Sequence, residues 1–195
     1  MKFATFRAVA VAAAVTAFAG VASAIPVIST FNFTIFGGTL TSNTGDITTS
    51  TSVSYAGGVY GVNGVAADNI GVNLFQTLTL TNPMVFTVGS VFSKEFSTGN
   101  GTFLETLTVN TFSTSISSAS ITASGTITQT VGTGFDPTPV FFSASYTQNG
   151  GPGAQINASF NNSTTPPGVI PEPTSLALVG LALLGVGFAR RQLKA

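Results

Sequence analysis

The sequence predicts an all-β protein whose body is an antiparallel β-sandwich, for which a jelly roll is one arrangement. Apolar residues alternate with Ser and Thr along most of residues 25–160, which is the pattern of strands with one buried face. Turn signals rich in Gly and Asn separate these runs, and no segment between Ile25 and Pro167 has helical apolar spacing over three turns. About 140 residues is one domain's worth, so we expect roughly eight or nine short strands around a single core.

Each alternating run supplies one expected element. The Thr residues between the apolar positions are β-branched, so they favour a strand while keeping its outer face polar. In chain order the runs are residues 31–35, 47–55, 70–80, 103–109, 121–131, 140–146 and 154–160. The turn signals are Asn43-Thr44-Gly45, Gly57-Gly58, Asn63-Gly64, Thr98-Gly99-Asn100-Gly101, Asp136-Pro137 and Asn149-Gly150-Gly151.

Residues 1–24 have the organisation of a secretory signal peptide. Lys2 and Arg7 precede an alanine-rich apolar run, and Ala22-Ser23-Ala24 offers the small-x-small pattern that signal peptidase reads. A permanent N-terminal membrane helix is the alternative, but the run is short and ends at this site. We therefore expect export by the general secretion machinery and cleavage after Ala24, which leaves Ile25 as the first residue.

The C-terminal part of the chain predicts a linker and a membrane segment. Residues 161–168, NNSTTPPG, read as a polar, proline-containing linker. The tail at 169–195 contains Pro171-Glu172-Pro173, which cannot join a helix interior and is held extended. An uncharged apolar run follows, and we expect a transmembrane helix at about 174–189.

This span is short and has a basic end. Residues 174–189 would reach about 24 Å as a helix, against a hydrocarbon core of about 30 Å. Bilayer thinning or snorkelling basic residues can absorb that mismatch. The basic residues behind the span are Arg190, Arg191 and Lys194, and such charges stay on the cytoplasmic side. The segment suits a transient hold in the inner membrane before processing, although a permanent anchor is also compatible with it.

This three-part tail resembles the PEP-CTERM sorting signal of Gram-negative bacteria. The likeness covers 169–194 and consists of Val-Ile-Pro-Glu-Pro-Thr, the apolar run and the basic end. The resemblance implies that an exosortase, a membrane-embedded cysteine transpeptidase-like enzyme, acts near Pro171-Glu172-Pro173. It also implies a producer of exopolysaccharide and a passenger destined for the cell surface or extracellular matrix.

The composition of the body excludes several classes of function. Between residues 25 and 167 one lysine stands against five carboxylates, a net charge of −4, so nucleic-acid binding is not expected. The chain has no Cys and no His. It therefore forgoes disulfides, the usual general base and the common zinc ligands. We expect no enzymatic activity, no catalytic residue, no cofactor and no metal site.

The five carboxylates of the body are the remaining candidates for a chemical role. Glu95 and Glu105 are candidates for a glycosidase pair by residue type, but nothing in their context sets them together. Lys94-Glu95 reads equally well as a charged strand edge or loop that blocks edge-to-edge pairing. Aspartates in the loops could bind calcium through their carboxylates. The preferred interpretation is that they initiate turns by hydrogen bonding to nearby backbone amides. These aspartates are Asp46, Asp68 and Asp136.

Two functions remain open from the sequence. The first is a non-enzymatic surface or matrix protein, associated with exopolysaccharide, biofilm or floc. The second is an adhesin or carbohydrate-binding module with ligand sites in its loops. The chain has no Trp and three Tyr, whereas its 17 Phe suit a core better than a sugar-stacking platform.

Overall fold

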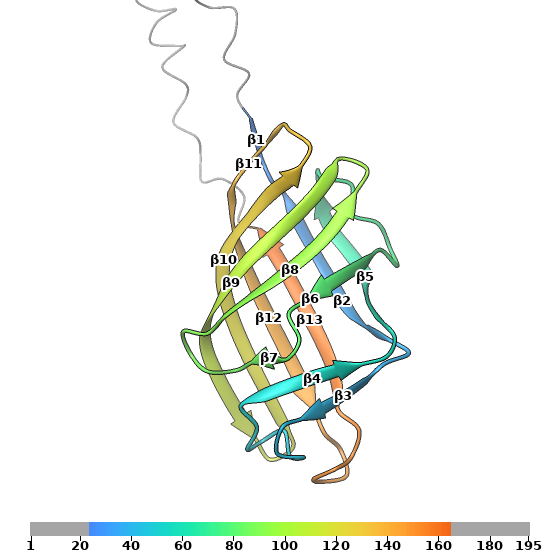
Figure 1. Ribbon diagram of the computed structural model, residues 1–195, viewed down its shortest axis with the longest axis vertical. Coiled ribbons are helices and arrows are strands. Elements are labelled where there is room, and N and C mark those ends of the chain that lie inside the picture. Colours follow the sequence, from blue (N-terminus) through green and yellow to red (C-terminus); the bar gives the residue numbers. More distant parts are fainter. Residues whose placement is uncertain (1–23, 165–195) are drawn as a thin grey trace, which may run out of the picture. The chain divides into compact units, whose positions relative to one another are not determined.

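Residues 24–164 are described by a computed structural model, in which eight strands form a closed antiparallel barrel (Figure 1). Around the ring their order is β10-β12-β13-β2-β5-β6-β8-β9. The barrel strands are β2 (Ser29–Phe36), β5 (Val59–Asp68), β6 (Thr77–Leu80), β8 (Val91–Thr98), β9 (Gly101–Ser115), β10 (Ser118–Val131), β12 (Thr138–Thr147) and β13 (Asn157–Thr164).

The prediction of an all-β antiparallel body is confirmed, whereas the prediction of a sandwich is wrong. A sandwich would leave sheet edges, but every barrel strand pairs with a neighbour on both sides, including β13 with β2 and β8 with β9. Alternation reports only that each strand has one buried face, which is equally true in both architectures. Closure therefore could not be read from the periodicity.

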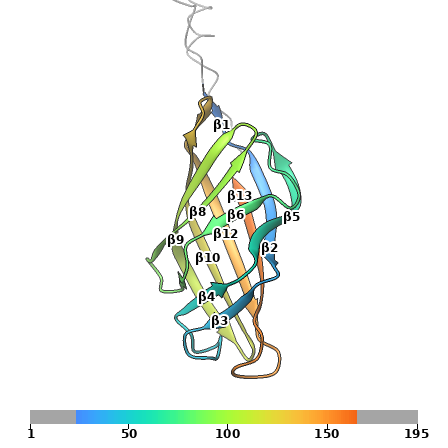
Figure 2. The same ribbon diagram turned by 45° about the vertical axis from the view of Figure 1, so that its right-hand side comes forward.

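Two small sheets lie near opposite ends of the barrel (Figures 1 and 2). At one end β1 (Ile25–Pro26) pairs in parallel with β11 (Phe135–Asp136). Toward the other end β3 (Thr39–Ser42) pairs with β4 (Ser52–Ala56), which in turn pairs with β7 (Met84–Val85). Within the described residues these thirteen strands are the whole of the regular structure.

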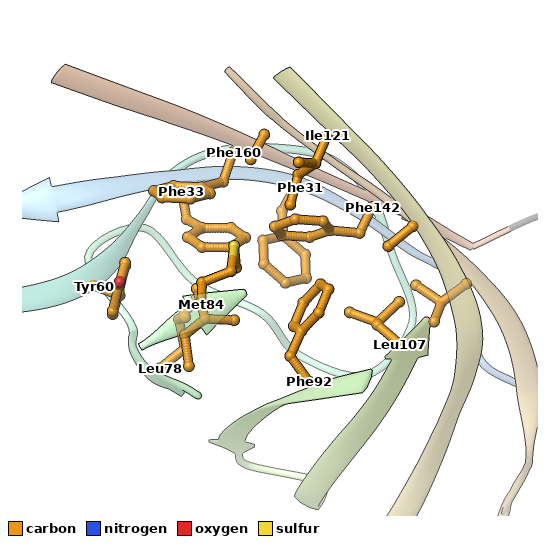
Figure 3. Close-up of a cluster of buried hydrophobic side chains, with 14 of the residues drawn as sticks. Phe31, Phe33, Tyr60, Leu78, Met84, Phe92, Leu107, Ile121, Phe142 and Phe160 are labelled. Atoms are coloured by element: carbon orange, nitrogen blue, oxygen red, sulfur yellow. The ribbon is translucent and has the colours of Figure 1, made fainter. Parts of the chain in front are cut away.

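Aromatic side chains fill the barrel interior (Figure 3). Phe33 is central: its ring stacks on Phe160 at 4.8 Å between centroids and lies 6.2 Å from Phe142. Phe92 meets Phe142 edge-on at 5.1 Å. Such aromatic pairs stabilise a core by about 0.5–1.5 kcal/mol beyond the burial of their area. The interior is a packed core rather than a channel.

Several expected elements are shorter than predicted. Residues 69–76 are not a strand, because the Asp68 carboxylate accepts hydrogen bonds from the amides of Ile70, Gly71 and Val72 and bends the chain. Residues 47–51 form a loop for a similar reason, with Asp46 accepting from the Thr48 amide.

Two further expectations about the body are corrected. Asn63-Gly64, expected as a turn, lies inside β5, where Asn63 is the extra residue at a register shift against Asn32 and Phe33 of β2, and the strand continues without reversing. Val131, expected to face the core, is 61% exposed at the end of β10, just past a register shift against β9.

Both ends of the described chain meet at one end of the barrel. The Ser29 amide donates to the Thr164 hydroxyl at 2.8 Å, and the Ile25 amide donates to the Gly134 carbonyl at 2.9 Å. Because β13 runs to Thr164, residues 161–164 belong to the barrel wall and not to the linker expected at 161–168.

The expected signal peptide and the expected transmembrane helix at about 174–189 lie outside the described residues. Within residues 24–164 no helix is long and apolar enough to span a membrane.

Candidate functional site

Three polar side chains lie together inside the barrel, and we call them the interior polar triad. They are Lys94 on β8, Glu105 on β9 and Asn162 on β13, each with 0% of its surface exposed. A buried amine, carboxylate and amide cost free energy unless they satisfy one another. Among the described residues, Lys94 and Glu105 are the buried residues that carry an ionisable amine and carboxyl group in this largely apolar core.

Strand parity explains how the triad reaches the core. Lys94 lies between the inward residues Phe92 and Phe96, and the register of β8 against β9 places it directly opposite Glu105. Asn162 follows Phe160 at the same parity on β13. The interpretation of Lys94-Glu95 as a strand edge or loop is therefore wrong: Lys94 takes an inward position in a strand paired on both sides.

Glu105 connects the other two members of the triad. The Lys94 Nζ lies 2.9 Å from the Glu105 Oε2, a close ion pair whose atoms are not aligned as a hydrogen bond. The Asn162 Nδ2 donates to the Glu105 Oε1 at 3.0 Å. The Asn162 Oδ1 is buried without a hydrogen-bond partner. One carboxylate thus holds the amine and the amide at its two oxygens.

Aromatic rings enclose the amine. The Lys94 Nζ lies 4.5 Å from the centroid of Phe31, 5.0 Å from that of Phe33 and 5.6 Å from that of Phe96. Burial lowers the pKa of the Lys94 ammonium and raises the pKa of the Glu105 carboxyl, while the attraction between the two groups opposes both shifts. Both burial effects favour the neutral amine and the neutral acid.

Glu95 and Glu105 do not form a glycosidase pair. Adjacent strand residues point to opposite faces, so Glu95, next to the inward Lys94, is exposed on the outer wall while Glu105 faces the interior. The barrel wall separates the two carboxylates, and no sugar could lie between them.

Glu95 instead lines a groove on the outer wall, which we call the wall groove. Its volume is about 590 Å³, and its lining includes Tyr55, Thr79 and Glu95. The groove opens where β5 and β6 pair through only two residue pairs before they diverge. The Tyr55 ring lies 4.7 Å from that of Tyr60. The Tyr55 ring, the Glu95 carboxylate and the Thr79 hydroxyl therefore line the same groove.

The loop aspartates Asp46 and Asp68 serve the backbone. Their carboxylates accept amide hydrogen bonds from residues two to four positions ahead, which confirms the interpretation that they initiate turns. Asp136 is exposed on β11. In residues 24–164 no three or more of the His, Cys, Asp and Glu side chains group as metal ligands would.

The predicted sorting and processing residues fall almost entirely outside the described part of the chain. Ala24 is the first described residue. The others, which lie outside it, are Ala22, Pro171, Glu172, Pro173, Arg190, Arg191 and Lys194. Of these, only Pro171, Glu172, Pro173, Arg190 and Arg191 lie within the part of the chain that matches a known protein family by sequence comparison.

That comparison matches residues 169–191 to the PEP-CTERM protein-sorting motif. The chain therefore carries the sorting signal of an exosortase substrate. This signal implies export and C-terminal membrane anchoring before processing. Comparison with curated proteins and with solved structures gave no significant match.

Sequence reasoning missed the interior polar triad. The alternation could have predicted that Lys94 and Glu105 face the core, because each has Phe or Leu two residues before and two residues after it. For Asn162 the Phe160–Asn162 spacing was available, but the neighbouring Asn, Ser and Pro residues favoured a linker. Nothing in the sequence indicated that three separate strands would bring these groups into contact.

Proposed function

We propose that this exosortase-sorted protein is a non-enzymatic component of the cell surface or extracellular matrix that associates with exopolysaccharide. The observation that carries the proposal is the PEP-CTERM motif at 169–191, because resemblance to this sorting signal implies a host that produces exopolysaccharide. Exosortase, signal peptidase and the inner membrane are its partners in transit.

The described body supports a structural role. Its interior is filled by side chains, and its buried amine and carboxylate have no exposed surface with which to meet a diffusing substrate. Hydroxyls pair across the outer wall, as between Thr111 and Thr122 at 2.6 Å and between Ser113 and Ser120 at 2.8 Å. A wall rich in hydroxyls suits many weak contacts with a hydrated polymer rather than one tight site.

A carbohydrate-binding module or adhesin is the second candidate, and the wall groove favours it. A sugar ring can stack on an aromatic face while a carboxylate accepts its hydroxyl protons. Tyr55 and Glu95 offer those two groups at the groove. This candidate places ligand recognition on the barrel wall rather than in the loops.

Binding of the exported protein to purified exopolysaccharide tests both roles. The variants are Glu95→Gln in the wall groove and Asp136→Asn as a charge-matched control, since Asp136 is exposed and lies outside the groove. In the structural role both variants bind as the unmodified protein does. A loss of about tenfold confined to Glu95→Gln would instead indicate a discrete site. If the unmodified protein does not associate with the polymer, the proposal is wrong.

A further inference from the structure

The interior polar triad contains the three groups that a self-catalysed amide bond requires. These are an amine as nucleophile, a side-chain amide as acyl donor and a carboxyl group in contact with both. From this geometry we propose that Lys94 and Asn162 join through an intramolecular isopeptide bond, with Glu105 as the catalytic residue. This is a single event within one chain and not turnover of a substrate.

The Glu105 carboxyl group positions both reactants. Its oxygen Oε2 lies 2.9 Å from the Lys94 Nζ, and its oxygen Oε1 lies 3.0 Å from the Asn162 Nδ2. The amine and the amide therefore both contact the same carboxyl group. The oxygen and nitrogen of an amide are assigned from their hydrogen bonds. With Glu105 protonated, a flipped Asn162 amide would accept from the acid through Oδ1, the atom that otherwise has no partner.

The reaction balances without an oxidant or cofactor. Lys94 transfers a proton to Glu105, and the neutral Nζ attacks the Asn162 Cγ while the acid protonates the amide oxygen. Glu105 then takes a proton from Nζ and gives it to Nδ2, which leaves as ammonia when the C–N bond breaks. The carbonyl re-forms and returns its proton to Glu105. The products are a Lys94–Asn162 amide and one ammonia molecule.

The surroundings favour this chemistry. A carboxyl group that shuttles protons must stay near its reactants and away from water, and all three triad residues are fully buried. The rings of Phe31, Phe33 and Phe96 surround the amine. Burial among them makes loss of the ammonium proton less costly than it would be in water. Fixed positions on three strands also supply the proximity that accelerates an intramolecular step.

The bond would connect opposite walls of the barrel. Three strands separate β8 from β13 in either direction around the ring. β13 is also the last strand before the segment that leads to the sorting signal. In an exported chain with no cysteine, a covalent bond at this place would hold the C-terminal strand as a disulfide does elsewhere.

The full chain offers a direct test by mass spectrometry after denaturation, with both termini assigned. We expect a mass lower than the sequence mass by one ammonia molecule. Lys94 is the only Lys or Arg between residues 25 and 167, so trypsin should divide an unlinked body into two pieces. In the linked protein the modified Lys94 resists trypsin and the body remains one piece. A cross-linked peptide containing Lys94 and Asn162 should appear after digestion with a protease that does not require lysine.

Variants assign the roles when circular dichroism, recorded before denaturation, shows that each has the β spectrum of the unmodified protein. Mass and digestion are then read on the denatured chains. Lys94→Arg, Glu105→Gln and Asn162→Leu should each have the full mass of their own sequence and be cut at position 94. The matched control is Asn161→Leu, an exposed neighbour on the same strand, which should keep the bond. The proposal is overturned if the unmodified chain has its full mass and is cut at Lys94, or if the mass deficit persists in Lys94→Arg.

Discussion

At the scale of residues, the interior polar triad is the feature that the core has to accommodate. A buried ion pair is weak evidence for stability, because desolvation of its charges can exceed their attraction. Lys94 and Glu105 nevertheless lie inside the barrel, each fully buried. A chemical role for the pair, rather than a stabilising one, accounts for keeping such groups in an aromatic core.

Removing one member of the pair should destabilise the barrel more than removing both. Glu105→Leu leaves the Lys94 amine buried without a partner, whereas the double variant Lys94→Met, Glu105→Leu leaves no buried charge. We expect the free energy of unfolding of the single variant to lie about 3–5 kcal/mol below that of the double variant. Urea unfolding measures both, and neither variant can form the isopeptide bond. Equal stability of the single and double variants would contradict this account.

At the scale of elements, close strand approach depends on a glycine in the middle of β10. Gly125 pairs with Leu107 on β9 and with Val140 on β12. A Cβ built at Gly125 would lie 1.8 Å from the carbonyl oxygen of Thr106. No side chain fits there unless the two strands move apart, so this glycine sets the packing of the barrel wall.

Gly125→Ala should therefore reduce the free energy of unfolding by about 1–3 kcal/mol, the usual range for overpacking. Gly99→Ala is the control, because Gly99 lies in the β8–β9 turn with no atom within 4 Å of an added Cβ. We expect its effect to stay within about 0.5 kcal/mol. Thermal or urea unfolding followed by circular dichroism compares them, and similar losses in the two variants would argue against the contact with Thr106.

At the scale of the whole molecule, sorting and folding are carried by separate parts of the chain. The sorting motif occupies 169–191, and the barrel ends at Thr164. The first and last barrel strands in chain order, β2 and β13, are joined at one end of the barrel through Ser29 and Thr164. The barrel is thus closed by its own strands and ends before the sorting motif begins.

Replacing Glu172 and Pro173 with Ala should block processing. The change keeps the apolar run but removes the charge and rigid extension that a processing enzyme can read. We expect the variant to remain in the inner membrane with its C-terminus intact, while the unmodified chain reaches the surface or medium. Mass spectrometry of the C-terminus makes the comparison. Surface material that still ends at Ala195 in an exosortase-bearing host would show that the tail is an ordinary anchor.

The sequence by itself determined the strand chemistry and the address of this protein. Period-two alternation identified inward residues such as Phe33, Phe142 and Phe160, because successive side chains of a strand point to opposite faces. A contiguous motif such as Pro171-Glu172-Pro173 can likewise be recognised from the sequence, because its residues are neighbours in the chain.

Only the tertiary structure decided that the strands close into a barrel and that Lys94, Glu105 and Asn162 meet inside it. Which strands pair depends on contacts between segments far apart in the chain, and alternation is the same in a sandwich and a barrel. The carboxylate that contacts Asn162 lies 57 positions away in sequence. Local sequence patterns do not predict contacts between residues so far apart in the chain. The three side chains therefore come together only when the barrel has closed.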